Sequence, residues 1–224
     1  MSRTNPVEET TSISNPTTAF IEWNAQNGQF KMWDNINKQV SFLEKPMRFA
    51  VLDQMSSVEG WLGDRGTAYS TGFRQSNEDI SVYVRKDGSQ TLHKRGTYSD
   101  IKDELKDEGI TYRKNIYAML CEDIDDVPIG SIVCIKLKGK SANLWIEGKY
   151  GDNSDLTNSS VQTIGRFKYP VWESIELSKD EIENAKDCDK ELQEYFNSLN
   201  HNATSHQDES VEVIKDDMAE EIPF

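Results

Sequence analysis

Short runs of alternating apolar and polar residues dominate the chain between Ala19 and Leu177. The runs are rich in aromatic and β-branched residues, and turn signals such as Asn27-Gly28 and Lys86-Asp-Gly-Ser89 separate them. Alternation with a period of two is typical of strands with one buried face, and Asn-Gly between two such runs predicts a β-hairpin. The expected strands are 19–23, 29–33, 39–43, 47–52, 80–85, 90–95, 111–121, 131–138, 161–167 and 172–177.

Three segments have helical periodicity instead. Apolar residues recur four positions apart within 99–108, and Gly109 follows as a suitable C-terminal cap. A second short helix is expected over 141–149. Ser178-Lys-Asp-Glu181 is a capping box, so a third helix is expected over 178–199. Its apolar stripe, which should pack on the strands, consists of Ile182, Ala185, Leu192, Phe196 and Leu199.

Many short strands with few helices predict a mainly β fold of the β+α kind, either a small barrel or a sandwich. An OB-fold-like barrel with added hairpins, a C-terminal helix and disordered ends fits the pattern, although periodicity does not separate it from other β-barrels. The expected organisation is an N-terminal arm over 1–17, a core over 18–177, the helix over 178–199 and a disordered acidic tail over 200–224.

The charge is unevenly distributed along the chain. The net charge is −14, yet Glu176 to Phe224 holds 15 acidic and 4 basic residues, a net of −11. The rest has 24 acidic and 21 basic residues, so the body is nearly neutral and its local basic surfaces can still hold phosphates.

The remaining composition indicates a cytoplasmic protein. No apolar run approaches the roughly 18 residues that a membrane span needs. The polar N-terminus argues against a secretory signal. Cys121, Cys134 and Cys188 form no C-x-x-C pair and are odd in number, so they are expected to be reduced.

The chain closes on acidic residues that lead directly into Ile222, Pro223 and a terminal Phe224. Pro223 restricts the backbone, and Phe224 offers both a ring and a free carboxylate, a combination suited to peptide capture. A solubilising brush with a frayed apolar end is the plainer alternative. The residues expected to bind a partner are Asp216, Asp217, Glu220, Glu221, Ile222, Pro223 and Phe224.

This ending resembles the tail of bacterial single-stranded DNA-binding proteins, which join an OB fold to a partner-recruiting C-terminal peptide. The body, with Phe30-Lys-Met-Trp33, Met47-Arg-Phe-Ala-Val-Leu52 and Gly60-Trp61, is more similar to single-stranded DNA-binding proteins of bacteriophages. The resemblance implies a non-enzymatic, sequence-tolerant protein that coats single-stranded DNA. It also implies that the tail recruits replication or recombination proteins.

Binding of single strands without sequence preference needs cations for the phosphates and exposed aromatic faces for the bases. Mixed clusters of both kinds recur along the chain. An aromatic residue in a strand is more often part of the core, so Phe30, Phe49 and Phe167 are expected to be buried. The residues expected to bind DNA are Trp61, Arg65, Tyr69, Arg74, Arg95, Arg113, Lys136 and Lys138.

Catalytic chemistry has little support in the sequence. The glycines at 60, 63 and 66 spell no phosphate-binding loop, no zinc-ligand spacing occurs, and no cofactor or metal is expected. The acidic segment 122–126 is interpreted as an exposed loop. Two rivals stay open: a protein-interaction adaptor that never touches DNA, and a metal-dependent single-strand nuclease that would use this acidic segment. Oligomeric state cannot be inferred from the residues.

Overall fold

A computed structural model describes residues 13–34, 39–43, 46–150 and 155–205. The described part is mainly β, as the alternation predicts, and contains three α-helices and one 3-10 turn, η1. In chain order the elements are β1 (Ala19–Asn24), β2 (Gln29–Asp34), β3 (Gln39–Phe42), β4 (Arg48–Trp61), η1 (Gly63–Arg65), β5 (Thr67–Ser70), β6 (Asp79–Lys86), β7 (Ser89–Thr97), α1 (Tyr98–Asp107), β8 (Thr111–Leu120), β9 (Ile132–Lys138), α2 (Gly139–Glu147), β10 (Asp155–Ile164), β11 (Phe167–Ser174) and α3 (Lys179–Ser205).

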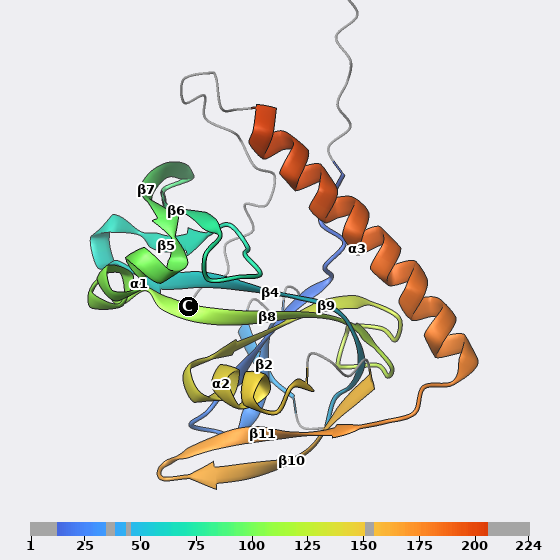
Figure 1. The fold of residues 1–224 in the computed structure, drawn as a ribbon. Coiled ribbons are helices and arrows are strands. Elements are labelled where there is room, and N and C mark those ends of the chain that lie inside the picture. The colour runs from blue at the N-terminus through green and yellow to red at the C-terminus, as the bar shows by residue number, and fades with distance from the viewer. Residues whose placement is uncertain (1–12, 35–38, 44–45, 151–154, 206–224) are drawn as a thin grey trace, which may run out of the picture.

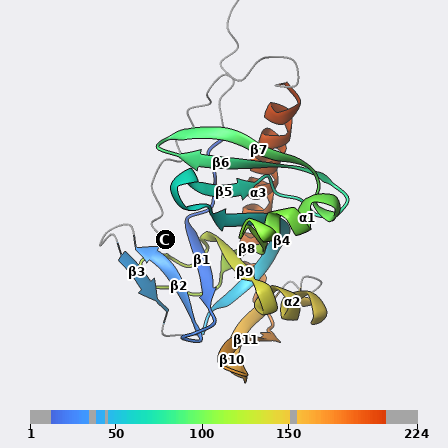
Figure 2. The same ribbon diagram turned by 90° about the vertical axis from the view of Figure 1, so that its left-hand side faces the viewer.

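All described strands join one curled sheet. Its order is β3-β2-β1-β9-β8-β4-β5-β6-β7, and β10 joins β4 and β11 off this path (Figure 2). The long strand β4 holds the parts together, because its start pairs with β10, its whole length with β8 and its end with β5. In Figure 1, β5–β7 and α1 lie at the upper left, and the β10–β11 hairpin lies at the bottom.

The inner face of the curled sheet carries two apolar cores. The main core gathers β1, β2, β4, β8, β9, β10 and β11 with α2 around Trp172, whose ring lies 5.8, 5.6 and 5.2 Å from those of Phe30, Phe49 and Trp145. The second core lies between β5, β6 and α1, where Ala68 and Val82 pack with Leu105. Phe30 and Phe49 are therefore buried as expected, whereas Phe167 is only partly buried.

Helix α3 packs on the opposite, outer face of the sheet. Leu192 and Phe196 contact β8 and β9 there, and the Phe196 ring lies 5.0 Å from that of Tyr117. The predicted capping box is confirmed: the Ser178 N–H donates to Glu181 Oε2 at 2.7 Å, and the Glu181 N–H donates to Ser178 Oγ at 3.3 Å. The stripe is only partly buried, because Ile182 and Leu199 stay exposed. The helix runs to Ser205, past the expected end at Leu199.

Turn chemistry decides where the hairpins fall. Gly28 has a φ of +73° in the β1–β2 turn, and Asp87 and Gly88 have φ of 51° and 76° in the β6–β7 turn, so both predicted hairpins are confirmed. The strands expected over 161–167 and 172–177 have other bounds in the structure, where β10 covers 155–164 and β11 covers 167–174. The turn between them lies at Gly165, with a φ of +62°, and Pro170 is inside β11. Pro170 is tolerated inside β11 because this strand pairs with β10 alone in the described sheet.

The glycine-rich segment 60–74 carries regular structure. It contains the end of β4, the turn η1 and the strand β5, which extends the sheet toward β6. Gly66 makes this possible, because its φ is +103° and a side chain there would collide with the carbonyl of Arg85. Gly66 therefore marks a tight turn from β4 into β5 that passes close to β6.

Candidate nucleic-acid interface

One side of the sheet, opposite the main core, is hereafter called the outer face. Residues that pair directly across an antiparallel or parallel ladder point to the same side. Lys31, Glu22, Lys136 and Asn115 are successive partners across β2, β1, β9 and β8. Their chain neighbours, such as Ile21 and Ile135, point into the main core. Polar side chains thus form a row across four strands.

Four cations meet in the middle of the outer face and are hereafter called the cation cluster: Lys31, Arg113, Lys136 and Lys138. Two carboxylates lie among them. Glu22 approaches Lys31 Nζ at 2.8 Å, Arg113 Nη1 at 3.1 Å and Lys138 Nζ at 3.3 Å. Glu59 Oε2 lies 3.4 Å from Arg113 Nε and 3.7 Å from Lys136 Nζ. Four positive and two negative groups leave the cluster with a local charge of +2.

Burial differs sharply within the cation cluster. The side chain of Arg113 is only 10% exposed, whereas that of Lys138 is 52% exposed. Burial raises the pKa of Glu22, but a hydrogen bond from Lys31 and the charges of Lys138, Lys31 and Arg113 outweigh it and hold this pKa below its ordinary value. Glu22 is therefore ionised at neutral pH. Arg113 is the most buried cation of the cluster, and Lys138 is the most exposed one.

A group of aromatic side chains adjoins the cation cluster on the same face and is hereafter called the aromatic patch: Trp61, Tyr69 and Tyr83 with Arg85. Glu59, Tyr69 and Tyr83 are successive partners across β4, β5 and β6. The two tyrosine rings lie 6.1 Å apart, and the Arg85 guanidinium lies 5.0 Å from the centre of the Tyr69 ring. Trp61 is 64% exposed. Glu59 thus stands between the aromatic patch and the cation cluster.

A fourth aromatic ring, that of Phe20, marks the other side of the cation cluster. Lys136 Nζ lies 5.1 Å from the centre of the Phe20 ring, and Phe20 pairs with Cys134 across β1 and β9. Cations therefore lie between aromatic rings on both sides. Helix α3 covers the neighbouring part of the face, over Tyr117 and Ile132. The cation cluster and the aromatic patch lie beyond this covered part.

Five of the eight predicted DNA-binding residues meet on the outer face. Arg113, Lys136 and Lys138 belong to the cation cluster, and Trp61 and Tyr69 belong to the aromatic patch. Arg95 is exposed on β7 and pairs with Ser81 across β6, beyond the aromatic patch. Arg65 lies apart from them in η1, where it pairs with Glu108 at 3.4 Å.

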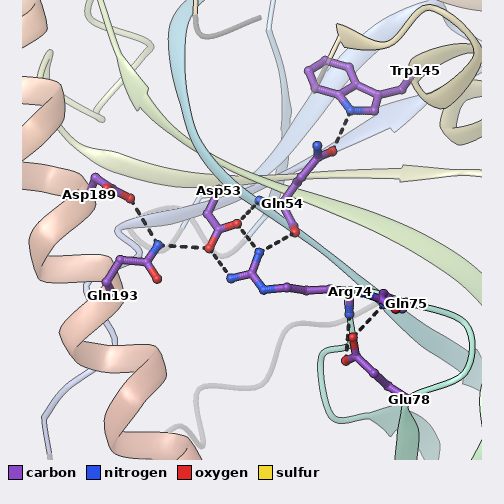
Figure 3. A network of polar contacts seen from close by, with 8 residues as sticks. All are labelled: Asp53, Gln54, Arg74, Gln75, Glu78, Trp145, Asp189 and Gln193. Atoms are coloured by element: carbon purple, nitrogen blue, oxygen red, sulfur yellow. Dashed lines mark hydrogen bonds and ion pairs between the residues drawn. The ribbon is translucent and has the colours of Figure 1, made fainter. Parts of the chain in front are cut away.

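Arg74 also lies apart, in a network that connects three elements (Figure 3). Its guanidinium donates two hydrogen bonds of 2.6 Å to the Asp53 carboxylate and one of 3.4 Å to the Gln54 carbonyl. Gln193 of α3 donates to Asp53 at 3.0 Å. Burial raises the pKa of Asp53, but these bonds outweigh it and hold the pKa below its ordinary value. Arg74 thus neutralises a carboxylate and ties the β5–β6 connection to β4 and α3.

Other members of the surface were missed from the sequence, although a signal was present. In β6 the apolar residues Ile80 and Val82 alternate with Tyr83 and Arg85, and the same alternation places Lys31 outside and Phe30 inside on β2. A period of two therefore marks Tyr83 and Arg85 as outward-facing. The same alternation marks Glu22 as outward-facing between Ile21 and Trp23, but only the parallel β1–β9 pairing brings it beside Lys136.

The acidic segment 122–126 forms the expected loop, in which Asp123, Asp125 and Asp126 are exposed. Its oxygens accept hydrogen bonds from within the protein, for example from the Ile129 N–H to Asp123 at 2.7 Å. In the described ranges no three His, Cys, Asp or Glu side chains are grouped to hold a metal ion. None of the described helices is long and apolar enough to cross a membrane. The predicted partner-binding residues 216–224 lie outside the described residues.

Because comparison with known proteins finds no relative, the function of this surface follows from its geometry alone. The chain matches no known protein family, no curated protein and no solved structure.

Proposed function

We propose that the protein binds single-stranded DNA without sequence preference and that the outer face is its binding surface. The observation that carries the proposal is the adjacency of the cation cluster and the aromatic patch on one sheet face, with Glu59 between them. Phosphates need cations, and unpaired bases need aromatic faces. Neither group alone would favour a single strand over another polyanion, but their combination does.

The strand order supports an OB-type core for this surface. β4, β8, β9, α2, β10 and β11 follow one another as the five strands of an OB barrel with a helix after the third. The pairs β4–β8, β8–β9, β10–β4 and β10–β11 fit that order. An OB barrel closes by pairing its third strand with its fifth. Here the third strand, β9, pairs in parallel with the added strand β1. The N–H of Lys168 in β11 donates to the carbonyl of Ala25, the residue after β1, at 2.8 Å.

In this OB reading, β8 and β9 are the second and third strands, the ones whose outer face binds oligonucleotides in OB folds. Arg113 lies on β8, and Lys136 and Lys138 lie on β9. The connection between the first two strands is enlarged into β5, β6, β7 and α1, which carries the aromatic patch. The added hairpins therefore extend the binding surface on the same side.

The acidic tail adds the second half of the proposed function, on the basis of its sequence. Residues 216–224 dock replication or recombination enzymes through Ile222 and Phe224, and the carboxylates before them steer the tail to basic surfaces. The body grips the exposed strand, and the tail brings in the enzymes that act on it.

A salt titration of binding to fluorescent oligo-dT tests the proposal. The double variant Lys136→Ala and Lys138→Ala should lower the slope of log K against log salt by about 1.4, since each phosphate contact to a single strand contributes about 0.7. The control is Lys102→Ala with Lys106→Ala, two exposed lysines on α1, which covers the second core. It should bind as the unchanged protein does.

Two outcomes would decide for the rivals. Absence of binding to oligo-dT at low salt would refute the proposal and favour an adaptor that uses only its tail. Degradation of the oligonucleotide in magnesium or manganese would instead favour a nuclease, and substitution of Asp123 and Asp126 would then be the next step.

A further inference from the structure

Glu22 occupies an unusual place in the centre of the cation cluster. Its carboxylate is within 3.3 Å of cations from three other strands: Lys31 of β2, Arg113 of β8 and Lys138 of β9. A carboxylate and a phosphate offer the same kind of acceptor oxygens to lysine and arginine donors. The arrangement therefore already holds an anion where the backbone of a bound strand would put one.

Hydrogen bonding inside the cation cluster is incomplete. Arg113 Nε is buried and forms no hydrogen bond in the described part of the chain, although Glu59 Oε2 lies 3.4 Å from it. Asn115 Oδ1, next to Lys136 in the ladder, is likewise buried without a donor. Buried polar atoms without hydrogen-bond partners cost free energy, so these two atoms destabilise the present arrangement of the site. Arg113 Nε is thus a buried donor that Glu59 approaches but does not satisfy.

The members of the cluster differ in their freedom to move. The side chains of Lys31 and Lys138 are 32% and 52% exposed, so both can turn outward to a new anion. Arg113, at 10% exposed, stays in place. Ion pairs at partly exposed positions are worth little, typically about 0–1 kcal/mol, so exchanging one acceptor for another is inexpensive for the two lysines.

From these observations we infer that Glu22 stands in for a backbone phosphate and competes with DNA for Lys31 and Lys138, which lowers the affinity of the outer face. The inference rests on the proposed function and deepens it. Binding of a strand exchanges the Glu22 contacts of the two lysines for phosphate contacts, while Arg113 keeps Glu22 in the sheet. The carboxylate thereby keeps the protein from binding polyanions too tightly and makes its release from DNA faster.

Glu59 is a weaker competitor in the same cluster. Its contacts, at 3.4 and 3.7 Å, are longer than the 2.8 to 3.3 Å contacts of Glu22, and they involve Arg113 and Lys136 only. Glu59 also lies at the border with the aromatic patch, where it pairs with Tyr69 across β4 and β5. Removing its charge should therefore raise affinity less than removing that of Glu22.

The test compares Glu22→Gln with Glu104→Gln in oligo-dT binding over a range of salt concentrations. Glu104 is an exposed α1 residue paired with Lys94, so its substitution removes one negative charge away from the outer face. Glu22→Gln should bind about tenfold more tightly at low salt, because Lys31 and Lys138 then give up no carboxylate contact when they bind the strand. The slope against log salt should change little, because the number of phosphate contacts stays the same. Glu104→Gln should change neither quantity appreciably.

A second measurement does not depend on DNA. Without its carboxylate the cluster holds unneutralised cations, so Glu22→Gln should gain more thermal stability from inorganic phosphate than the unchanged protein does, at matched ionic strength. Glu22→Asp keeps the charge and should resemble the unchanged protein in both assays, which separates loss of charge from loss of folding.

Two outcomes separate failure of the proposed function from failure of the inference about Glu22. If the unchanged protein ignores oligo-dT at low salt, the proposed function fails. If it binds but Glu22→Gln binds equally or more weakly, with no added response to phosphate, Glu22 organises the cations and the competition is refuted.

Discussion

The two faces of the sheet carry different kinds of side chain, and adjacent residues of one strand point to opposite faces. On β1, Ile21 is fully buried in the main core, while its neighbour Glu22 faces the cation cluster. On β6, Val82 lies in the second core, while Tyr83 faces outward. Buried side chains on the inner face stabilise the fold, as do those under α3, while the part of the outer face beyond α3 carries charged and aromatic side chains. The residues proposed to bind DNA can therefore change without loss of the main core.

The largest expected contrast between the faces is in stability. Phe49 is fully buried against Trp172, whereas Phe42 is 38% exposed at the end of β3. Phe49→Ala should lower the free energy of unfolding by about 3–5 kcal/mol, because it removes apolar burial and leaves a cavity. Phe42→Ala should cost well under about 1 kcal/mol. Urea denaturation measures both. Equal losses would mean that the two faces are not separated in this way.

The reverse contrast is expected in DNA binding. Tyr83→Ala should weaken binding to oligo-dT by about 1–3 kcal/mol, the usual value of one stacked base, which is roughly 5- to 150-fold. Tyr83→Phe keeps the ring and should keep the affinity. Fluorescence anisotropy measures both variants. If Tyr83→Phe loses as much as Tyr83→Ala, the hydroxyl matters and stacking is not the reason.

Much of the fold can be predicted from local sequence, because period-two alternation and turn residues act over short distances. The Asn27-Gly28 hairpin, the β6–β7 hairpin and the capping box at Ser178 depend only on neighbouring residues and are all confirmed. The errors arise where a distant partner decides. Pro170 lies inside β11 because this strand pairs with β10 alone among the described strands, and Gly66 allows the turn before β5 to pass close to the carbonyl of Arg85.

The candidate site is predictable to a smaller extent for the same reason. Arg113, Lys136 and Lys138 were expected as separate basic clusters, and only the antiparallel β8–β9 register brings them together. Arg74 has the same composition signal as they do, yet the β5–β6 connection carries it to Asp53. The sequence shows which residues can bind an anion, and the pairing of distant strands decides which of them lie close enough to bind the same anion.

The smallest expected effect lies at the border between the uncovered outer face and the part under α3. Asp53 receives two hydrogen bonds from Arg74 and one from Gln193, which together hold its pKa below the ordinary value of 3.8 despite burial. A carboxyl group with a depressed pKa stabilises the fold fully above its unfolded pKa and progressively less as pH falls through the folded pKa. The stabilisation by Asp53 is therefore present at neutral pH and lost in acid.

Asp53→Asn should accordingly cost about 1 kcal/mol in the free energy of unfolding at pH 7, a modest value because Arg74 is half exposed. The difference from the unchanged protein should stay constant down to about pH 4 and shrink below it, where the carboxyl takes up a proton. Asp126→Asn, at an exposed position of the acidic loop, makes the same charge change and should have no effect. Urea denaturation at several pH values measures the difference. A loss that persists unchanged in acid would show that the geometry of the Asp53 side chain, and not its charge, connects the outer face to α3.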